Sequence, residues 1–332
     1  MLRSARHLSI LAAGLVLAAL PLAAPPADAQ TPPSRPECVA PAQPGGGFDL
    51  TCRVGASAME ISGMLGQPMQ VTFMPGGIGA VAYNVFNTNR TEDPNAIVAF
   101  SSGSLLNIAV GKYGTWTEDD ARWLATAGAD FGAVIVKADS PFQTLDDVMD
   151  AFKANPAGVV VGAGGSVGSQ DWMKAALLMN AVGIDPRQMR YVAFDGGGES
   201  IAALLGGSIQ VYTGDVAEMA QHIDAGTMRI LAVMSPERLP APFDQIPTAR
   251  ELGYDVEWTI LRGFYMAKDA PDAAYDFYVA AFEKAYADPA FAEVQKSRGL
   301  LPLDMAGPEF EADVKKRVDR MREIARAAGL IQ

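Results

Sequence analysis

Residues Ala40–Arg53 read APAQPGGGFDLTCR and contain the local unit from which the fold class is inferred. It connects a short apolar run, CVAPA, to a segment with a helical pattern through three consecutive glycines. A glycine-rich turn between a strand and a helix leaves the first amides of the helix open to a ligand. The stretch is therefore a phosphate loop, a dinucleotide loop, a flexible tether, or a cradle for another anion.

The same unit recurs along the chain: an apolar run, a turn rich in glycine or serine, then a helical pattern. Helices are predicted near residues 50–64, 80–87, 105–110, 170–180 and 200–205, with a long C-terminal helix over 308–328. Valine-rich runs that alternate with helices are typical of parallel sheets. Two sets of such units predict an α/β fold with two lobes, each a mainly parallel sheet flanked by helices.

The chain is expected to cross between the lobes twice. The strand-like segment 123–141 leads from the first lobe to the second, and Met228–Ser235 leads back. The first lobe is therefore predicted to comprise residues 30–136 and 235–332, and the second lobe residues 137–234.

Residues 1–29 are predicted to be a secretory signal peptide. Arg3 and Arg6 precede the apolar run Leu8–Leu20, and Ala27 and Ala29 form a small-x-small cleavage pattern. The run is short for a membrane span and is followed by prolines, which favours a signal peptide over a membrane anchor. The predicted location is the periplasm.

Charge and cysteine content exclude several classes of partner. The net charge of −12 argues against nucleic acid. No metal site is expected, because Cys38, Cys52 and His222 have no ligand spacing. Export permits a disulfide between Cys38 and Cys52, the alternative being two buried thiols.

The glycine loops do not match an enzyme's signature. None of them carries the lysine of a Walker loop, and GAGGSVG at 162–168 lacks the third glycine of a dinucleotide fingerprint. No paired histidine and nucleophile stand out, so no catalytic residue and no cofactor are predicted. Glycines at the carboxyl ends of strands in both lobes instead predict a cleft that binds a small anion.

Several segments resemble one receptor family. ECVAPAQPGGGFDLTCR, MPGGIGAVAYN, SSGSLLN, GGSVGSQDWMKAALL, MRYVAFDGGGES, IPTARELGYDVEW and LRGFYMA are similar to the periplasmic receptors of tripartite tricarboxylate transporters, within the wider Bug-type solute-binding proteins. The resemblance covers nearly the whole chain after residue 29. It implies a class II-like periplasmic binding fold without catalysis, which delivers its ligand to a membrane permease with a large and a small subunit.

The resemblance also implies where the ligand binds. Backbone amides of Gly45–Asp49 and of Asp195–Glu199 are expected to hold one carboxylate, partly through water. The expected ligand-binding residues are Gly45, Gly46, Gly47, Phe48, Asp49, Ser102, Ser104, Ser166, Ser169, Gln170, Gly196, Gly197, Gly198, Glu199, Asp215 and Arg262. Phe48 stands where relatives have a small polar residue, so it is expected to wall the cleft.

Four of these residues have alternative roles. Asp49 is equally suited to capping its own helix, and Ser104 and Ser169 to capping theirs. Arg262 lies between apolar residues and needs a partner. That partner is either a ligand carboxylate or a local acid, Asp255 or Glu257.

The expected ligand is citrate or a related tricarboxylate, bound by a monomer. The alternatives are a dicarboxylate receptor of the same transporter class and a periplasmic sensory module that signals to a kinase.

Overall fold

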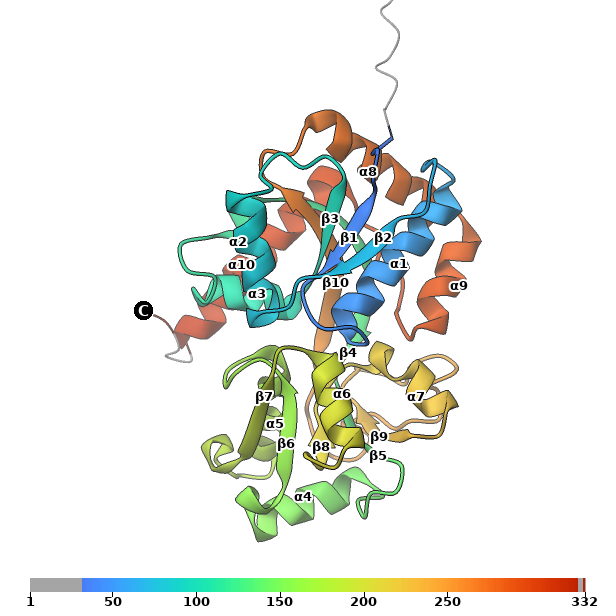
Figure 1. The fold of residues 1–332 in the computed structure, drawn as a ribbon. Helices are drawn as coiled ribbons and strands as arrows, with labels where there is room; N and C mark the ends of the chain where they lie inside the picture. The colour runs from blue at the N-terminus through green and yellow to red at the C-terminus, as the bar shows by residue number, and fades with distance from the viewer. Residues whose placement is uncertain (1–31, 328–330, 332) are drawn as a thin grey trace, which may run out of the picture.

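The computed structural model describes residues 32–327 and 331. The predicted signal peptide, residues 1–29, lies outside the described residues. Figure 1 shows two lobes, one above the other, each built from a sheet and the helices that cover it. Within the described part of the chain, no helix is both long and apolar enough to cross a membrane.

The first lobe contains a five-stranded sheet in the order β2-β1-β3-β10-β4. Its strands are β1 (Glu37–Ala40), β2 (Gln70–Phe73), β3 (Ala96–Ser101), β4 (Ala121–Phe131) and β10 (Thr259–Ala267). Strands β1, β2 and β3 run parallel, whereas β10 is antiparallel to both β3 and β4. The helices of this lobe are α1 (Gly47–Ser62), α2 (Ala80–Thr88), α3 (Ser102–Ala109), α8 (Asp272–Tyr286), α9 (Pro289–Ser297) and α10 (Gly307–Ala327).

The second lobe repeats this plan with the strand order β7-β6-β8-β5-β9. Its strands are β5 (Ala133–Lys137), β6 (Val160–Gly164), β7 (Arg190–Phe194), β8 (Val211–Tyr212) and β9 (Met228–Val233). The parallel strands are β6, β7 and β8, and β5 is antiparallel to its neighbours β8 and β9. The helices are α4 (Leu145–Ala154), α5 (Gln170–Ala181), α6 (Gly197–Leu205) and α7 (Ala220–Asp224), with a 3₁₀ turn, η5, at Val216–Glu218.

The α/β fold with two lobes is therefore as predicted, and both sheets are mixed. The antiparallel strands β10 and β5 are those nearest the crossings between the lobes. Each of these two strands enters its sheet from the other lobe and does not follow a βα crossover within that sheet. It is therefore not required to run parallel to its neighbours.

The lobe boundaries differ from the predicted ones at both crossings. The first crossing is at Gly132, because β5 already pairs within the second sheet. Residues 228–235 do not cross back, since β9 pairs with β5 in that sheet. The segment after β9 packs Leu239, Phe243 and Val256 into the second lobe's core, and the chain returns only at Trp258.

The two crossings lie side by side. The Gly132 amide donates to the Trp258 carbonyl at 2.9 Å, and the Met234 amide donates to the Gly132 carbonyl at 2.7 Å. Gly132 also forms an antiparallel bridge with Asp215 of the second lobe. These bonds hold the two connecting segments together at Gly132 and Trp258, which makes this point the expected hinge between the lobes.

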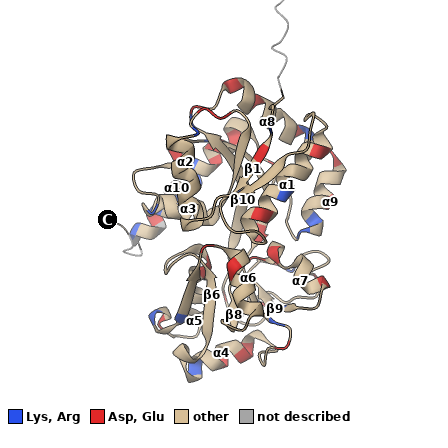
Figure 2. Cartoon of the chain, viewed as in Figure 1, with Lys and Arg blue, Asp and Glu red and all other residues tan. Residues whose placement is uncertain are grey.

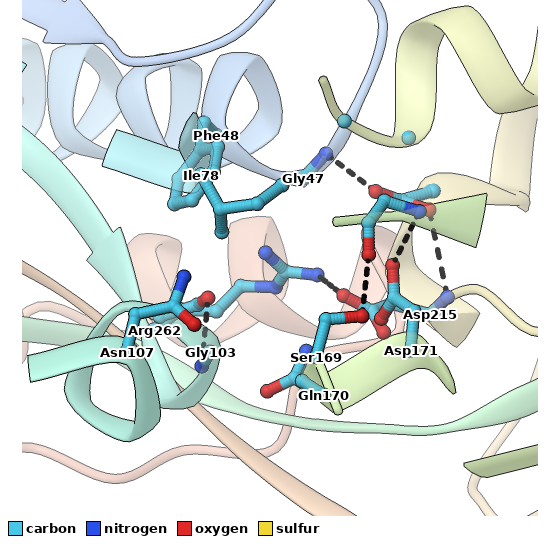
Figure 3. Close-up of a pocket in the computed structure, with 15 residues that line it drawn as sticks. Gly47, Phe48, Ile78, Gly103, Asn107, Ser169, Gln170, Asp171, Asp215 and Arg262 are labelled. Carbon is cyan, nitrogen blue, oxygen red and sulfur yellow. Dashed lines mark hydrogen bonds and ion pairs between the residues drawn. The ribbon is translucent and has the colours of Figure 1, made fainter. Parts of the chain in front are cut away.

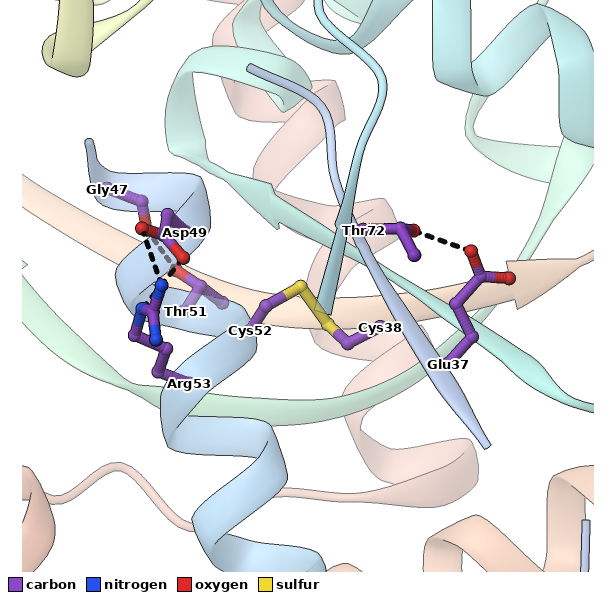
Figure 4. The surroundings of a disulfide bond; sticks show 8 residues. All are labelled: Glu37, Cys38, Gly47, Asp49, Thr51, Cys52, Arg53 and Thr72. Atoms are coloured by element: carbon purple, nitrogen blue, oxygen red, sulfur yellow. Dashed lines mark hydrogen bonds and ion pairs between the residues drawn. A yellow bond between two sulfur atoms is a disulfide. The ribbon is translucent and has the colours of Figure 1, made fainter. Parts of the chain in front are cut away.

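A disulfide joins Cys38 to Cys52, with the two Cα atoms 5.5 Å apart (Figure 4). Cys38 lies in β1 and Cys52 in α1, so the bridge ties the strand to the helix that follows the PGGG turn. The bridge fixes the base of the loop that leads into the cleft.

Candidate functional site

A cavity of about 40 Å³ lies between the lobes, and both contribute to its walls (Figure 3). It is lined by Gly47, Phe48, Ile78, Ser101, Gly103, Asn107, Gly164, Ser169, Gln170, Asp171, Gly196, Gly197, Asp215, Glu218 and Arg262. Eight of the expected ligand-binding residues are in this set, namely Gly47, Phe48, Ser169, Gln170, Gly196, Gly197, Asp215 and Arg262.

Two glycine loops from opposite lobes meet at this cavity. Helix α1 begins at Gly47 and helix α6 at Gly197. A Cβ atom on Gly46 would lie 2.6 Å from the amide nitrogen of Gly198, a distance that no side chain tolerates. Glycine is thus required by the close approach of the loops, which brings two positively polarised helix ends to one space.

Arg262 is buried in an ion-pair network rather than free for a ligand. Its side chain is 1% exposed. Nε donates to Asp130 Oδ2 at 2.7 Å, and Nη2 donates to Asp215 Oδ2 at 2.6 Å. The predicted local partners were wrong: Asp255 and Glu257 both pair with Arg250.

One nitrogen of Arg262 still faces the cavity. No hydrogen bond is found for Nη1 among the described residues, and it occupies the space where a Cβ on Gly47 would stand. In Figure 3 this end of the guanidinium points toward the start of α1. Arg262 can therefore stabilise both the junction of the lobes and an anion beside Gly47.

Lys174 provides a second buried cation. Its side chain is fully buried in α5. Nζ donates to Asp171 at 2.7 Å, to the Gly214 carbonyl at 2.9 Å, and to Asp215. Its three donors are all used by the protein, which leaves none for a ligand.

Glu218 brings a carboxyl group to the start of α1. It accepts a hydrogen bond from the Gly47 amide at 2.5 Å and another from the Tyr212 hydroxyl. Burial, and then the charge of Asp215, raise the pKa of Glu218 to about 8, against the opposing attraction of Arg262. A proton can therefore reside on this carboxyl near neutral pH.

The pKa of Asp215 is shifted in the opposite direction. Burial raises its pKa, but the adjacent Lys174 and Arg262 outweigh that effect and hold the pKa below its ordinary value. Asp130 and Asp171 complete the group, so four carboxyls face two cations where the lobes meet. Figure 2 shows that acidic positions are spread over both lobes. Among the described residues, this group is not arranged to hold a metal ion.

Neutral polar side chains complete the cavity. Ser169 caps α5 by accepting from the Trp172 amide at 3.3 Å, as the capping alternative proposed. Next to it, the side chain of Gln170 lies at the cavity, only 7% of the residue is exposed, and Oε1 has no partner among the described residues. A buried amide oxygen without a partner in the protein is a position where a ligand donor would gain a hydrogen bond.

The remaining expected residues lie outside the cavity. Asp49 accepts from the Gly45 amide at 2.8 Å and pairs with Arg53, so it stabilises its own loop. Ser102 accepts from the Leu261 amide at 2.8 Å. Gly45 and Gly46 line a separate depression with Asp49, and Ser166 and Glu199 line the outer cleft. Ser104 belongs to the capping box of α3, and Gly198 packs against Pro44.

Seven residues of the cavity were not among the expected ligand-binding residues: Ile78, Ser101, Gly103, Asn107, Gly164, Asp171 and Glu218. Glu218 could have been found, because Asp215 and Glu218 have the spacing of a capping box, which they form at η5. Asp171 gave no such signal, since an acid in the first turn of a helix is usually solvated.

The two-lobed fold agrees with comparisons to known proteins. The family model of the tripartite tricarboxylate transporter family receptor matches residues 56–330. A UPF0065 protein from Cupriavidus necator is 28% identical over 325 residues, covering 94% of each chain. Protein BugT from Bordetella pertussis is 27% identical over 245 residues, covering 73% of this chain and 72% of its own.

Solved structures share the fold. The periplasmic binding protein BugD superposes with a TM-score of 0.77 at 23% identity, covering 90% of this chain and 99% of its own. MatC from Rhodopseudomonas palustris, solved with bound malate, gives 0.73 at 20% identity, covering 87% and 98%. Rpa4515 from R. palustris, solved with adipate, gives 0.75 at 17% identity, covering 89% and 97%. Because the family model spans most of the sequence, this chain belongs to the receptor family of the tripartite tricarboxylate transporters.

Proposed function

We propose that this protein is exported, captures a small organic polycarboxylate between its lobes, and delivers it to a membrane permease with a large and a small subunit. One observation carries the proposal: the N-termini of α1 and α6, from opposite lobes, meet at one cavity between the lobes. Amides at helix N-termini favour an anion, and a site shared by two lobes favours the closed arrangement when it is filled.

The first carboxylate of the ligand would lie beside Gly47 and Gly197. The Gly47 amide already donates to Glu218, so the remaining amide groups of the two loops and the free Nη1 of Arg262 supply its donors, and Gln170 contributes a neutral amide. Phe48 forms an apolar wall of the same cavity. Donors fixed by a folded backbone lose little entropy on binding, which favours affinity.

The charges of the cavity favour a dicarboxylate over citrate. Both buried cations already pair with aspartates, and the cavity walls carry further carboxyl groups. Placing three ionised carboxylates there would set like charges against each other without enough cations. Malate and adipate, bound by two proteins of the same fold, are dicarboxylates.

The experiment is a ligand screen on protein without its signal peptide, unfolded and refolded to remove any copurified acid. Melting temperature and calorimetric affinity are measured with malate, adipate, citrate and acetate. A ligand present at a hundredfold its Kd adds about 2.7 kcal/mol of stability. The proposal expects larger shifts with malate or adipate than with citrate. Tighter binding of citrate would refute the preference for a dicarboxylate, and no binding of any acid would refute the function.

A further inference from the structure

The inner cavity continues into an outer cleft. The outer space, about 680 Å³, shares Ile78, Asn107 and Ser169 with the inner cavity and extends between the lobes toward the surface. A ligand with one end beside Gly47 can therefore extend past these three residues. Its second end would lie in the outer cleft.

Lys112 lines this outer cleft. It follows α3 in the first lobe, and its Nζ lies 3.4 Å from both Ser166 Oγ and the Val167 carbonyl in the second lobe. Among the described residues, Lys112 forms no ion pair, in contrast to Arg262 and Lys174. The two contacts are long and leave a third N–H free.

The acidic residues of the outer cleft do not neutralise Lys112. Glu199 accepts from the Asp195 amide at 3.1 Å, which holds its carboxylate at the start of α6. Neither Asp195 nor Glu199 lies within ion-pair distance of Lys112 in the described structure. Lys112 is thus a cation of the cleft whose charge remains available to a ligand.

We propose that Lys112 binds the second anionic group of an elongated ligand and makes the receptor selective for linear diacids over monoacids of the same length. The inference rests on the proposed function and names the specificity residue of that site. Lys112 would then contact the end of the ligand that lies farthest from Gly47. Because Lys112 touches the second lobe, the second anionic group would bind as the lobes close.

The test compares adipate with hexanoate, and succinate with butyrate, by isothermal titration calorimetry. The variants are Lys112→Gln, Lys112→Arg and the control Lys153→Gln, which removes a half-exposed lysine from α4. Loss of a hydrogen bond to a charged group should weaken diacid binding by roughly tenfold or more in Lys112→Gln. Monoacid binding should stay the same, Lys112→Arg should keep most of the preference, and Lys153→Gln should match the parent protein.

Two results would overturn this inference without overturning the proposed function. Equal losses for diacids and monoacids would make Lys112 a closure contact, and unchanged diacid binding would remove it from the site. If the parent protein binds none of these acids, the proposed function fails and the inference fails with it. These outcomes are distinct, because the first two require a parent protein that binds.

Discussion

Replacing Glu218 by glutamine should flatten the dependence of stability on pH. The carboxyl of Glu218 lies between the Gly47 amide of one lobe and the Tyr212 hydroxyl of the other. Glutamine has the same shape and keeps an oxygen that can accept from Gly47, but it cannot titrate. The substitution therefore removes a buried ionisable group with little change in packing.

The size of the effect follows from the pKa of Glu218. Burial and Asp215 raise it from 4.5 to about 8. Between these values the folded protein holds a proton that the unfolded chain releases. The stabilisation is thus fully present below pH 4.5 and is lost as pH rises toward 8. Each unit of pKa is worth about 1.36 kcal/mol, so Glu218 changes the unfolding free energy by on the order of 3–5 kcal/mol across this range.

The assay is urea unfolding of ligand-free protein at intervals from about pH 5 to about pH 8.5. The parent protein should lose stability as pH rises, and Glu218→Gln should lose markedly less. Asp130 and Asp171 remain in both proteins, so the difference between the two curves isolates residue 218. The exposed residue Glu293 provides the control Glu293→Gln, which should follow the parent curve. Parallel curves for the parent and Glu218→Gln would refute the reasoning.

Three further predictions concern residues that support the cavity: an ion-pair network, the disulfide and a glycine of the second loop. Arg262→Ala should lower the unfolding free energy by about 3–5 kcal/mol, because it leaves buried carboxylates unpaired; a loss below about 1 kcal/mol in urea unfolding would contradict this. Alkylation of the exported protein without reductant should leave Cys38 and Cys52 unmodified in mass spectra, and the double serine variant should lose about 3 kcal/mol; two alkylated thiols would exclude the bridge. Gly198→Ala would place a Cβ 2.2 Å from the Pro44 carbonyl oxygen, whereas a Cβ on Gly66 meets no atom within 4 Å. Gly198→Ala should therefore abolish the ligand-induced thermal shift and preserve ligand-free stability, whereas Gly66→Ala should change neither.

The sequence predicted the parts of the fold that depend on local patterns. Alternation of apolar runs and helices gave two α/β lobes, and the predicted helix over 170–180 agrees with α5 (Gln170–Ala181). It did not locate the return crossing, because a strand has the same pattern whether it stays in one sheet or enters another. The position of β9 depends on its pairing with β5, which lies far away in sequence.

The site was predictable where the backbone itself forms it. Glycine loops at strand ends indicated an anion cradle, and Gly47 and Gly197 do line the cavity. The charge network was not predictable, since Arg262 meets Asp130 only through the pairing of β10 with β4, and meets Asp215 only where the second lobe docks. No local pattern distinguishes the buried lysine at Lys174 from a solvated one.

The hinge at Gly132 also determines how far each part of the cleft moves. When one body turns against another, displacement grows with distance from the axis of rotation. Asp215 forms a bridge with Gly132 itself, and Asp130 lies two residues before Gly132. The ion pairs of Arg262 with these two residues therefore lie at the hinge and can persist while the cleft opens. Lys112, in the outer cleft, lies farther from the hinge, so a small rotation of the lobes separates Lys112 from Ser166. The ion pairs near the hinge would thus set the angle between the lobes when no ligand is bound. A ligand that links the lobes at the outer cleft would change this angle most effectively, because it acts farthest from the hinge.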